Sequence, residues 1–311
     1  MQVVWFKRDL RLEDHAPLSA ALNGAPTLLL YVFEPELWRD SHYSERHWRF
    51  VAQSLLEMNA RLEPLGHRVR IVEGAVVDAL SDIAEQNTIR ALYSYEETGL
   101  RRTYDRDLAV ARWCQEKGIP WHEFQSNGVQ RGRTHRRGWG KAWHQFMARA
   151  TDSPVWEALP SAEPELAFGR VEEWGAERLR RLAEPVSVLE QVGGVAQANA
   201  VLDSFFGGRV HNYHRSLSKP TLSRKHCSRI SPYLAWGNLS VRQVYQRLLH
   251  EQTQHGKSRA LSAFNSRLHW HCHFIQKFEA EDRIEFEPMN SGYEQFDDPW
   301  DELNEQAWIE A

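Results

Sequence analysis

The sequence predicts an α/β domain followed by a helical one. Up to about residue 125, short apolar runs alternate with amphipathic helical patterns, whereas from residue 193 onward only helical periodicity remains. A strand, a helix and another strand in succession imply right-handed crossovers and a parallel sheet covered on both faces. We therefore expect a doubly wound α/β N-terminal domain with a parallel sheet, and an all-α region after it.

Five apolar runs are expected to form the strands of this sheet. Residues 27–33, TLLLYVF, are a continuous apolar run of the kind found in a strand buried on both faces. The other four runs cover residues 3–6, 67–72, 90–95 and 119–124. Between the strands we expect a helix with apolar residues spaced by three and four from Trp48 to Leu62, a helix over 76–86, and a helix over 101–117 that ends at Gly118.

The middle of the chain has a different composition. A basic, glycine-containing segment at 128–141 is followed by a stretch at 151–190 that contains four prolines. Such a composition is typical of a connector, here with a short helix over 141–149. Beyond it, apolar positions predict helices from Ala198 to Phe206, from Val241 to Leu249 with Ser240 as N-cap, and over 258–279. We assign residues 1–125 to the α/β domain, 126–190 to a connector and 191–311 to the helical domain.

The bulk composition limits the partners and the location. Hydrophobic residues make up 42% and charged residues 26% of the chain, and the formal net charge is −4. A nucleic-acid partner would therefore need a local basic patch. The three cysteines have no CxxC spacing, no apolar run reaches the length of a membrane span, and the N-terminus becomes charged after six residues. We expect a cytoplasmic protein without membrane association.

Common catalytic signatures do not occur in this sequence. It contains no GxGxxG, GxxxxGK[ST], HExxH or GxSxG string. A dehydrogenase, a P-loop NTPase or a serine hydrolase is therefore not supported. We name no catalytic residue.

The first informative string is VVWFKRDLRLEDHAPL at residues 3–18. From charge alone, we expect its ionic residues, at 7–14, to form a solvated loop after a strand, held by Arg–Asp pairs. As a string it resembles the opening of the antenna domain of the photolyase/cryptochrome family of blue-light flavoproteins. That opening is a hydrophobic-Trp-Phe-basic-Arg-Asp-Leu-Arg run followed by Asp and a short apolar helix.

The second string is SRISPYLAWGNLSVR at residues 228–242. A serine-rich loop entering a helix offers backbone N–H groups and hydroxyls that suit a pyrophosphate, although a merely capped helix start is the alternative. Positive charge is nearby on Lys219, Arg224, Lys225 and Arg229. The string resembles the family pattern Ser-x-Leu-Ser-Pro-Tyr-Leu-x-x-Gly-x-(Leu/Ile)-Ser-x-Arg, which opens the FAD-binding domain.

This resemblance implies a set of FAD-binding residues. The phosphate loop would consist of Cys227, Ser228, Arg229, Ile230 and Ser231, with Tyr213 as a neighbouring FAD contact. Most members have a hydroxyl side chain where Cys227 stands. One hydrogen-bond donor is therefore weaker here, because a thiol donates poorly.

The third string is RLHWHCHF at residues 267–274, where the family has a helix reading Glu-Leu-Ile-Trp-Arg-Glu-Phe-Tyr. The resemblance makes Trp270 the ring that stacks on a flipped pyrimidine dimer. Arg267 replaces the acid that binds the bases, and His271 replaces the arginine that faces the flavin. We therefore expect Trp270 and Arg267 at the substrate and His271 at the cofactor.

The histidines of this string also raise the question of zinc. Only His269 and His273 share a helix face, and the sequence offers no matching pair of ligands elsewhere. Imidazoles that line an anionic cleft or pack in the core are the favoured interpretation. We expect no metal site.

A fourth feature is a run of cations without an intervening acid. Its members are Arg131, Arg133, Arg136, Arg137 and Lys141, interleaved with His135, Trp139 and Trp143. Such a run is usually a solvated face. Because tryptophans are interleaved with the cations, a contact with the DNA phosphate backbone and a role between the domains are the two alternatives.

The resemblance implies light-dependent repair of cyclobutane pyrimidine dimers in ultraviolet-damaged DNA, by electron transfer from reduced FAD, a carbon–carbon lyase reaction. Family members continue further, so we expect an incomplete FAD-binding domain with weak FAD binding, and repair only with the missing part supplied. The resemblance also implies a possible second, antenna chromophore, whose identity the sequence leaves open. The alternatives are a cryptochrome-type blue-light photoreceptor and a non-catalytic nucleotide-binding or interaction module built on the α/β domain.

Overall fold

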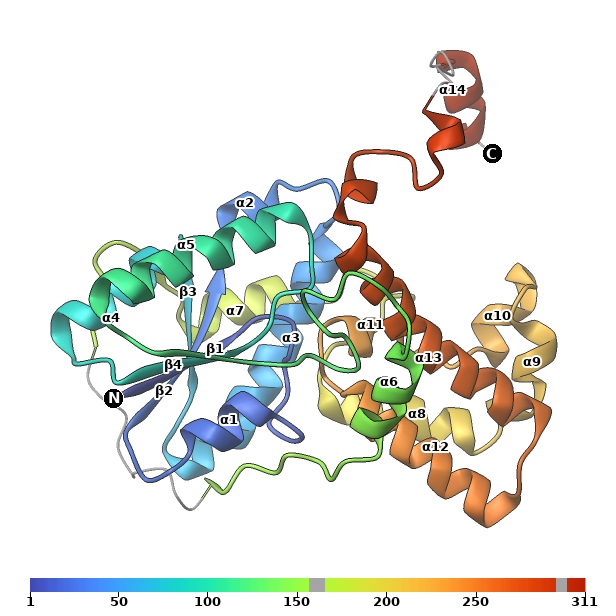
Figure 1. The fold of residues 1–311 in the computed structure, drawn as a ribbon, viewed down its shortest axis with the longest axis horizontal. Helices are drawn as coiled ribbons and strands as arrows, with labels where there is room; N and C mark the ends of the chain where they lie inside the picture. Colours follow the sequence, from blue (N-terminus) through green and yellow to red (C-terminus); the bar gives the residue numbers. More distant parts are fainter. Residues whose placement is uncertain (157–165, 295–300, 311) are drawn as a thin grey trace.

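A six-stranded sheet forms the centre of the N-terminal half (Figure 1). The computed structural model describes residues 1–156, 166–294 and 301–310. The strand order is β5-β4-β1-β2-β3-β6, and the first five strands are parallel. The strands are β1 (Gln2–Phe6), β2 (Thr27–Phe33), β3 (Val69–Glu73), β4 (Ala91–Tyr95), β5 (Trp121–Phe124) and the antiparallel β6 (Glu172–Glu173). The predicted doubly wound α/β fold is confirmed, with strand ends shifted by at most two residues.

Helices cover both faces of the sheet, because its strands bury side chains in both directions. Along β1, Val4 and Phe6 belong to one apolar cluster and Val3 and Trp5 to the other. This alternation follows from the two-residue repeat of a strand. The helices of this half are α1 (Ala16–Ala21), α2 (Pro35–Trp38), α3 (Glu45–Leu62), α4 (Val76–Gln86) and α5 (Arg101–Lys117), and α7 (Ala176–Ala183) packs on α3.

The segment predicted as a connector partly returns to the sheet. Strand β6 pairs with the edge of β3, and the ring of Trp174 stacks on Phe33 with centroids 4.4 Å apart. Leu179 is buried on α7. The sequence pattern missed this return because its apolar residues are isolated among charged ones. The domain boundaries remain a prediction.

The ionic loop after β1 is not solvated, contrary to the expectation from charge alone. Asp9 lies 2.6 Å from His15, Lys7 pairs with Asp107, and Asp14 pairs with Arg242. Isolated charges are too costly to bury, so each of these groups has a partner of opposite charge or a hydrogen bond. The buried side chains of the loop are Lys7, Asp9, Arg11 and Asp14.

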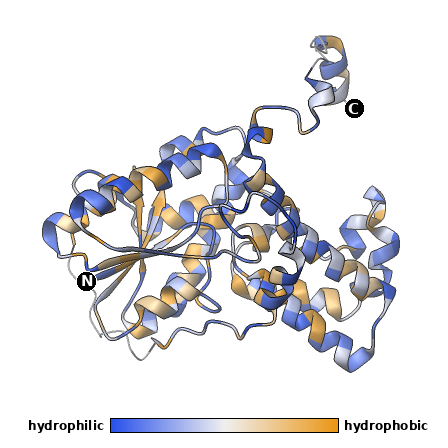
Figure 2. Cartoon of the chain, viewed as in Figure 1, coloured by the Kyte–Doolittle hydropathy of each residue, from blue (hydrophilic) through white to orange (hydrophobic). Residues whose placement is uncertain are grey.

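The C-terminal half is helical, as predicted, and Figure 2 shows apolar residues concentrated where its helices meet. Ser240 caps α12 by accepting a hydrogen bond from the backbone N–H of Gln243, which confirms that N-cap. No helix among the described residues combines the length and apolarity needed to cross a membrane. The helices are α6 (Trp139–Met147), α8 (Val195–Phe206), α9 (Tyr213–Ser216), α10 (Pro220–His226), α11 (Ser231–Ala235), α12 (Val241–His255), α13 (Arg259–Ala280) and α14 (Glu302–Glu310).

A close backbone contact joins the two halves. Leu10 N–H donates to the carbonyl of Trp236 at 3.0 Å, and the Asn238 side chain donates to the carbonyl of Leu10 at 2.9 Å. Gly237 between them has φ +73°, and a Cβ there would lie 2.4 Å from the carbonyl oxygen of Arg8. Only glycine satisfies both the conformation and the space. This explains the glycine of the second string.

Candidate functional site

The loop 227–230 connects α10 to α11 and points its carbonyl groups inward. Arg209 donates to the carbonyls of Cys227 and Ser228, the latter at 3.4 Å. Gln191 donates to the carbonyl of Arg229 at 2.7 Å, and Arg229 has φ +59°. Among the described residues, the backbone N–H groups of residues 228–231 find no acceptor. The loop therefore offers several donors to a ligand oxygen atom.

Two guanidinium groups at this loop lack an acidic partner. In the part of the chain that the structure describes, neither Arg209 nor Arg229 forms an ion pair with a carboxylate. Burial lowers the pKa of Arg209, and the charge of Arg229 lowers it further. Two neighbouring cations without an anion are unfavourable on their own. A doubly negative group such as a pyrophosphate would relieve this repulsion.

Tyr213, on α9, lies on the apolar side of the same loop. Its ring packs edge-on against Phe205 and Phe264, at 5.3 Å and 5.7 Å between centroids. Burial, with a contribution from Cys227, raises the pKa of Tyr213 to about 12, while the charge of Arg267 lowers it. The structure thus brings Tyr213, Cys227 and Arg267 into one neighbourhood.

Helix α13 presents an exposed aromatic face. The indole of Trp270 is 44% exposed, and the ring of Phe274, which is 55% exposed, lies 5.9 Å from it. The guanidinium carbon of Arg267 lies 4.3 Å from the centre of the Trp270 ring. The predicted stacking surface is therefore accessible, with one cation placed over it.

His271 faces the α/β half. It lines a cavity of about 150 Å³ together with Lys7, Arg8 and residues of α11. Burial, aided by the charge of Arg8, lowers the pKa of His271 to about 4. Within the described residues no hydrogen bond joins His271 to the loop 227–231, so its predicted contact with the cofactor stays a prediction.

The basic segment divides into paired and unpaired cations. Arg131 forms a bidentate pair with Glu123 at 2.6 and 2.8 Å, and Arg133 is occupied by the carbonyls of His135 and Arg137. Arg136 contacts the ring of His273 at 2.8 Å. In the part of the chain described by the structure, the side chains of Arg137 and Lys141 are exposed and make no ion pair. These two residues remain the best candidates for phosphate contacts.

The interleaved tryptophans are not accessible to bases. Trp139 and Trp143 are only 2% and 1% exposed, and both rings pack against His269, at 4.8 Å and 5.0 Å. Their periodicity therefore reflects the contact of α6 with α13. Over the described ranges, no group of three or more potential ligands is arranged to hold a metal ion.

The crevice at the carboxyl ends of β1 and β2 is filled by side chains. Arg106 pairs with Glu34 at 2.8 Å and with Glu97 at 2.5 Å. The cavity that remains beside Trp48 and Tyr43 has a volume of only about 30 Å³. That space holds about one water molecule. A second chromophore does not fit there.

Comparisons with known proteins agree with the two strings. The DNA photolyase family profile matches residues 2–152. The deoxyribodipyrimidine photo-lyase of Vibrio cholerae is 29% identical over 290 residues, which cover 87% of this chain and 60% of that protein. Cryptochrome-2 of Gallus gallus is 26% identical over 333 residues, covering 99% of this chain and 56% of the relative. The chain belongs to the photolyase/cryptochrome family. This chain spans about 60% of the length of these two curated relatives.

Solved structures of the photolyase/cryptochrome family share the fold. The cryptochrome of Synechocystis sp. PCC6803 aligns with a TM-score of 0.78 at 19% identity, covering 99% of this chain and 67% of that one. A class III photolyase from Agrobacterium tumefaciens aligns with a TM-score of 0.77 at 19% identity, covering 98% and 64%. At this identity, the likeness concerns the fold.

Sequence reasoning missed the residues that shape the loop. Arg209 binds two carbonyl groups of the loop 227–230 and Gln191 binds a third, but neither residue belongs to the motif at 228–242. The only signal for Arg209 was its position after Gly207 and Gly208, where the chain leaves α8. For Gln191 the sequence carries no signal, because its role depends on a tertiary contact.

Proposed function

We propose that this chain provides the FAD-phosphate site of a photolyase that repairs pyrimidine dimers in ultraviolet-damaged DNA by light. The observation that carries this proposal is the pair of Arg209 and Arg229, which lies at a loop with unused N–H groups and has no carboxylate partner within the described residues. The family supports FAD as the anionic ligand. Because the chain spans about 60% of the length of its curated relatives, repair is proposed for a protein of those relatives' full length.

The residues present fit the phosphate end of FAD. Backbone N–H groups of residues 228–231 would bind phosphate oxygens, and Arg229 would place its charge beside them. Arg209 holds the loop carbonyls away from the anion, which keeps the donors directed toward it. Tyr213 closes the apolar side. Reduced FAD, when bound, supplies the electron for dimer splitting on excitation.

On the substrate side, Trp270 would orient a flipped lesion by stacking. Such stacking contributes about 1–3 kcal/mol per base. Arg267 carries a positive charge where an acid stands in the family pattern, so this chain would bind the negatively charged backbone near the lesion more readily than the base edges. The exposed cations Arg137 and Lys141 would add a contact that is independent of sequence.

A titration of the purified chain with FAD tests the cofactor site. Arg209→Met should weaken FAD binding by about tenfold, because it removes a positive charge beside the phosphate loop and the hydrogen bonds that hold two of the loop's carbonyls. The matched control is Arg180→Met, which removes an exposed cation from α7 and should leave the affinity unchanged. If Arg209→Met binds FAD as tightly as the wild type, the loop is not the phosphate site.

A cryptochrome-type photoreceptor is the second candidate. It is favoured by the position of Arg267, which covers one face of the Trp270 indole and so reduces the ring surface open to a base. Repair of irradiated oligonucleotides under blue light, with the segment found in longer relatives supplied, separates the two functions. Repair supports the photolyase, whereas a stable photoreduction of FAD without repair supports the photoreceptor.

A further inference from the structure

The basic segment contains a cation whose partner is a titratable ring rather than a carboxylate. Nη1 of Arg136 lies 2.8 Å from Nε2 of His273 on α13. A guanidinium group has N–H donors and no acceptor, so the imidazole nitrogen must accept this hydrogen bond. His273 is therefore neutral in this contact, with its proton on Nδ1. The contact lasts only as long as the ring takes up no second proton.

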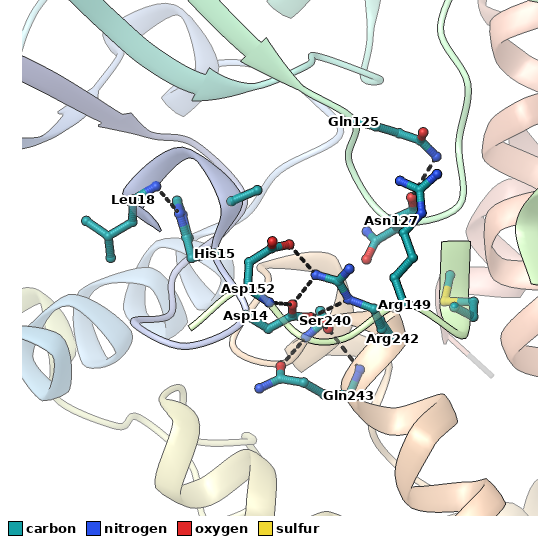
Figure 3. A network of polar contacts seen from close by, with 12 residues as sticks. Asp14, His15, Leu18, Gln125, Asn127, Arg149, Asp152, Ser240, Arg242 and Gln243 are labelled. Atoms are coloured by element: carbon teal, nitrogen blue, oxygen red, sulfur yellow. Dashed lines mark hydrogen bonds and ion pairs between the residues drawn. The ribbon is translucent and has the colours of Figure 1, made fainter. Parts of the chain in front are cut away.

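This contact differs from the ion pairs that join the two halves of the chain. Arg242 donates to Asp14 and, at 2.5 Å, to Asp152 (Figure 3). Within the described residues, no carboxylate pairs with Arg136 or with His273. An aspartate titrates near pH 4, whereas imidazole has an ordinary pKa of about 6.5. Mild acid can therefore break the Arg136 contact and leave the Arg242 contact in place.

The groups that face the His273 ring disfavour a proton on it. Arg136 approaches from the basic segment, Lys277 lies one turn further along α13, and the ring of His269 stacks at 6.4 Å between centroids. From α6, the neutral indole of Trp139 lies 5.8 Å away. Burial, Arg136 and Lys277 lower the pKa of His273 below its ordinary value. The ring is therefore neutral at neutral pH and becomes charged only in acid.

The backbone around Arg136 is braced, so loss of the contact frees the side chain alone. Arg133 donates to the carbonyl of Arg137, and the carbonyl of Arg136 accepts from Trp139 N–H at 3.0 Å, where α6 begins. The side chains of Arg136 and Arg137 are exposed. A protonated His273 would repel the Arg136 guanidinium, which could then extend into solvent as Arg137 does.

We propose that His273 is a proton-controlled gate on the phosphate-binding surface of the basic segment. The neutral ring holds Arg136 on α13. The protonated ring releases Arg136 to a nucleic-acid phosphate and adds its own charge, whereas Arg137 and Lys141 are available at every pH. Protons and DNA then bind cooperatively, since each favours the released form. The inference rests on the DNA contact of the proposed function and adds its regulation by pH.

The first experiment follows the His273 ring by NMR in the free chain, with its signal identified by its loss in His273→Gln. Arg136→Met removes the hydrogen-bond donor and the cation beside the ring, so the pKa of His273 should rise toward about 6.5. The matched control is Arg137→Met. It removes the neighbouring cation, which donates nothing to the ring in the described structure, and should leave that pKa nearly unchanged.

The second experiment measures binding of an undamaged double-stranded oligonucleotide by fluorescence anisotropy, over a range of salt, at about pH 7.5 and about pH 5.5. In the wild type, acid should raise the affinity about tenfold and steepen the salt dependence by about one phosphate contact. His273→Gln can still accept from Arg136 but takes up no proton, so its affinity should rise less than about twofold. The control His135→Gln removes a titratable ring of the same segment that does not contact the Arg136 side chain, and should keep the rise.

Three results would overturn the gate. They are an unchanged His273 pKa in Arg136→Met, an equal rise of affinity in the wild type and His273→Gln, and loss of that rise in His135→Gln. A chain that binds no DNA at either pH refutes the DNA contact of the proposed function, and the inference falls with it. The two failures are distinguishable, because the NMR measurement needs no DNA.

Discussion

Replacing Arg242 by Met should destabilise the protein strongly, because it leaves a buried carboxylate without its cation. Arg242 is 5% exposed and donates through Nε to Asp14 at 3.2 Å and through Nη2 to both Asp14 and Asp152. Breaking a buried ion pair on one side costs about 3–5 kcal/mol. Asp14 keeps two donors, the Ser240 hydroxyl and the Asp152 N–H at 2.9 Å, so we expect the lower end, about 3 kcal/mol. Met preserves the packing of the stem on Phe146.

Urea unfolding measures this loss, with Arg247→Met on the same helix as the control. Arg247 pairs with Asp203 and Glu251 in a more exposed setting, where such pairs contribute below about 1 kcal/mol. The double variant Asp14→Asn/Arg242→Met should cost much less than the sum of the single variants, because each removes the other's partner. A loss below about 1 kcal/mol for Arg242→Met, or additive single variants, would refute the reasoning.

The loss should also depend on pH in a defined direction. Burial alone would raise the pKa of Asp14, but hydrogen bonds from Arg242 and Ser240 hold that pKa below its ordinary value. A carboxyl group with a depressed folded pKa stabilises the protein above its unfolded pKa, about 3.9, and this stabilisation disappears as the pH falls through the folded pKa. In Arg242→Met the burial effect prevails and the pKa of Asp14 rises. The difference in the free energy of unfolding between the variant and the wild type should therefore become smaller as the pH falls from 7.

Two further predictions concern α13. Since burial lowers the pKa of His271 to about 4, the unfolded chain binds this proton first and stability falls as the pH drops from about 6.5 toward 4. His271→Gln should lose less stability over that interval in thermal melts; an unchanged pH profile would contradict the assignment. Trp270→Ala should reduce the preference for ultraviolet-damaged over undamaged DNA, whereas Arg137→Gln should weaken both equally and flatten the salt dependence. If Trp270→Ala prefers damaged DNA as strongly as the wild type does, Trp270 is only a surface residue without a role in lesion binding.

The sheet could be predicted almost completely, because its strands are continuous apolar runs. The run at Thr27–Phe33 is buried at every position and has the bounds expected from the sequence. The return of Trp174 to Phe33 could not be predicted, since a single indole in a charged stretch has no periodicity. Local patterns report on the neighbours of a residue in sequence. A stacking contact between distant segments leaves no such pattern.

Only those residues of the candidate site that belong to a contiguous sequence motif could be predicted. The loop at Cys227 was located by its resemblance, but the paired guanidinium of Arg131 was not foreseen, because its partner Glu123 lies on the preceding strand. The buried ions of the first string were misjudged for the same reason. Lys7 and Asp107 are a hundred residues apart, and only the fold brings the cation to its anion.

The late arrival of β6 has a consequence for the growing chain on the ribosome. The five parallel strands are complete once residue 124 has been made, yet β3 pairs with Glu172 and Glu173, which follow about fifty residues later. At a synthesis rate of about 5–20 residues per second this delay lasts about 2–10 seconds. During that time the nascent domain carries an open row of backbone donors and acceptors, to which another nascent chain can pair. The clamp of Arg70 on Glu173 ends that exposure, so this short strand protects the protein while it is being made as well as afterwards.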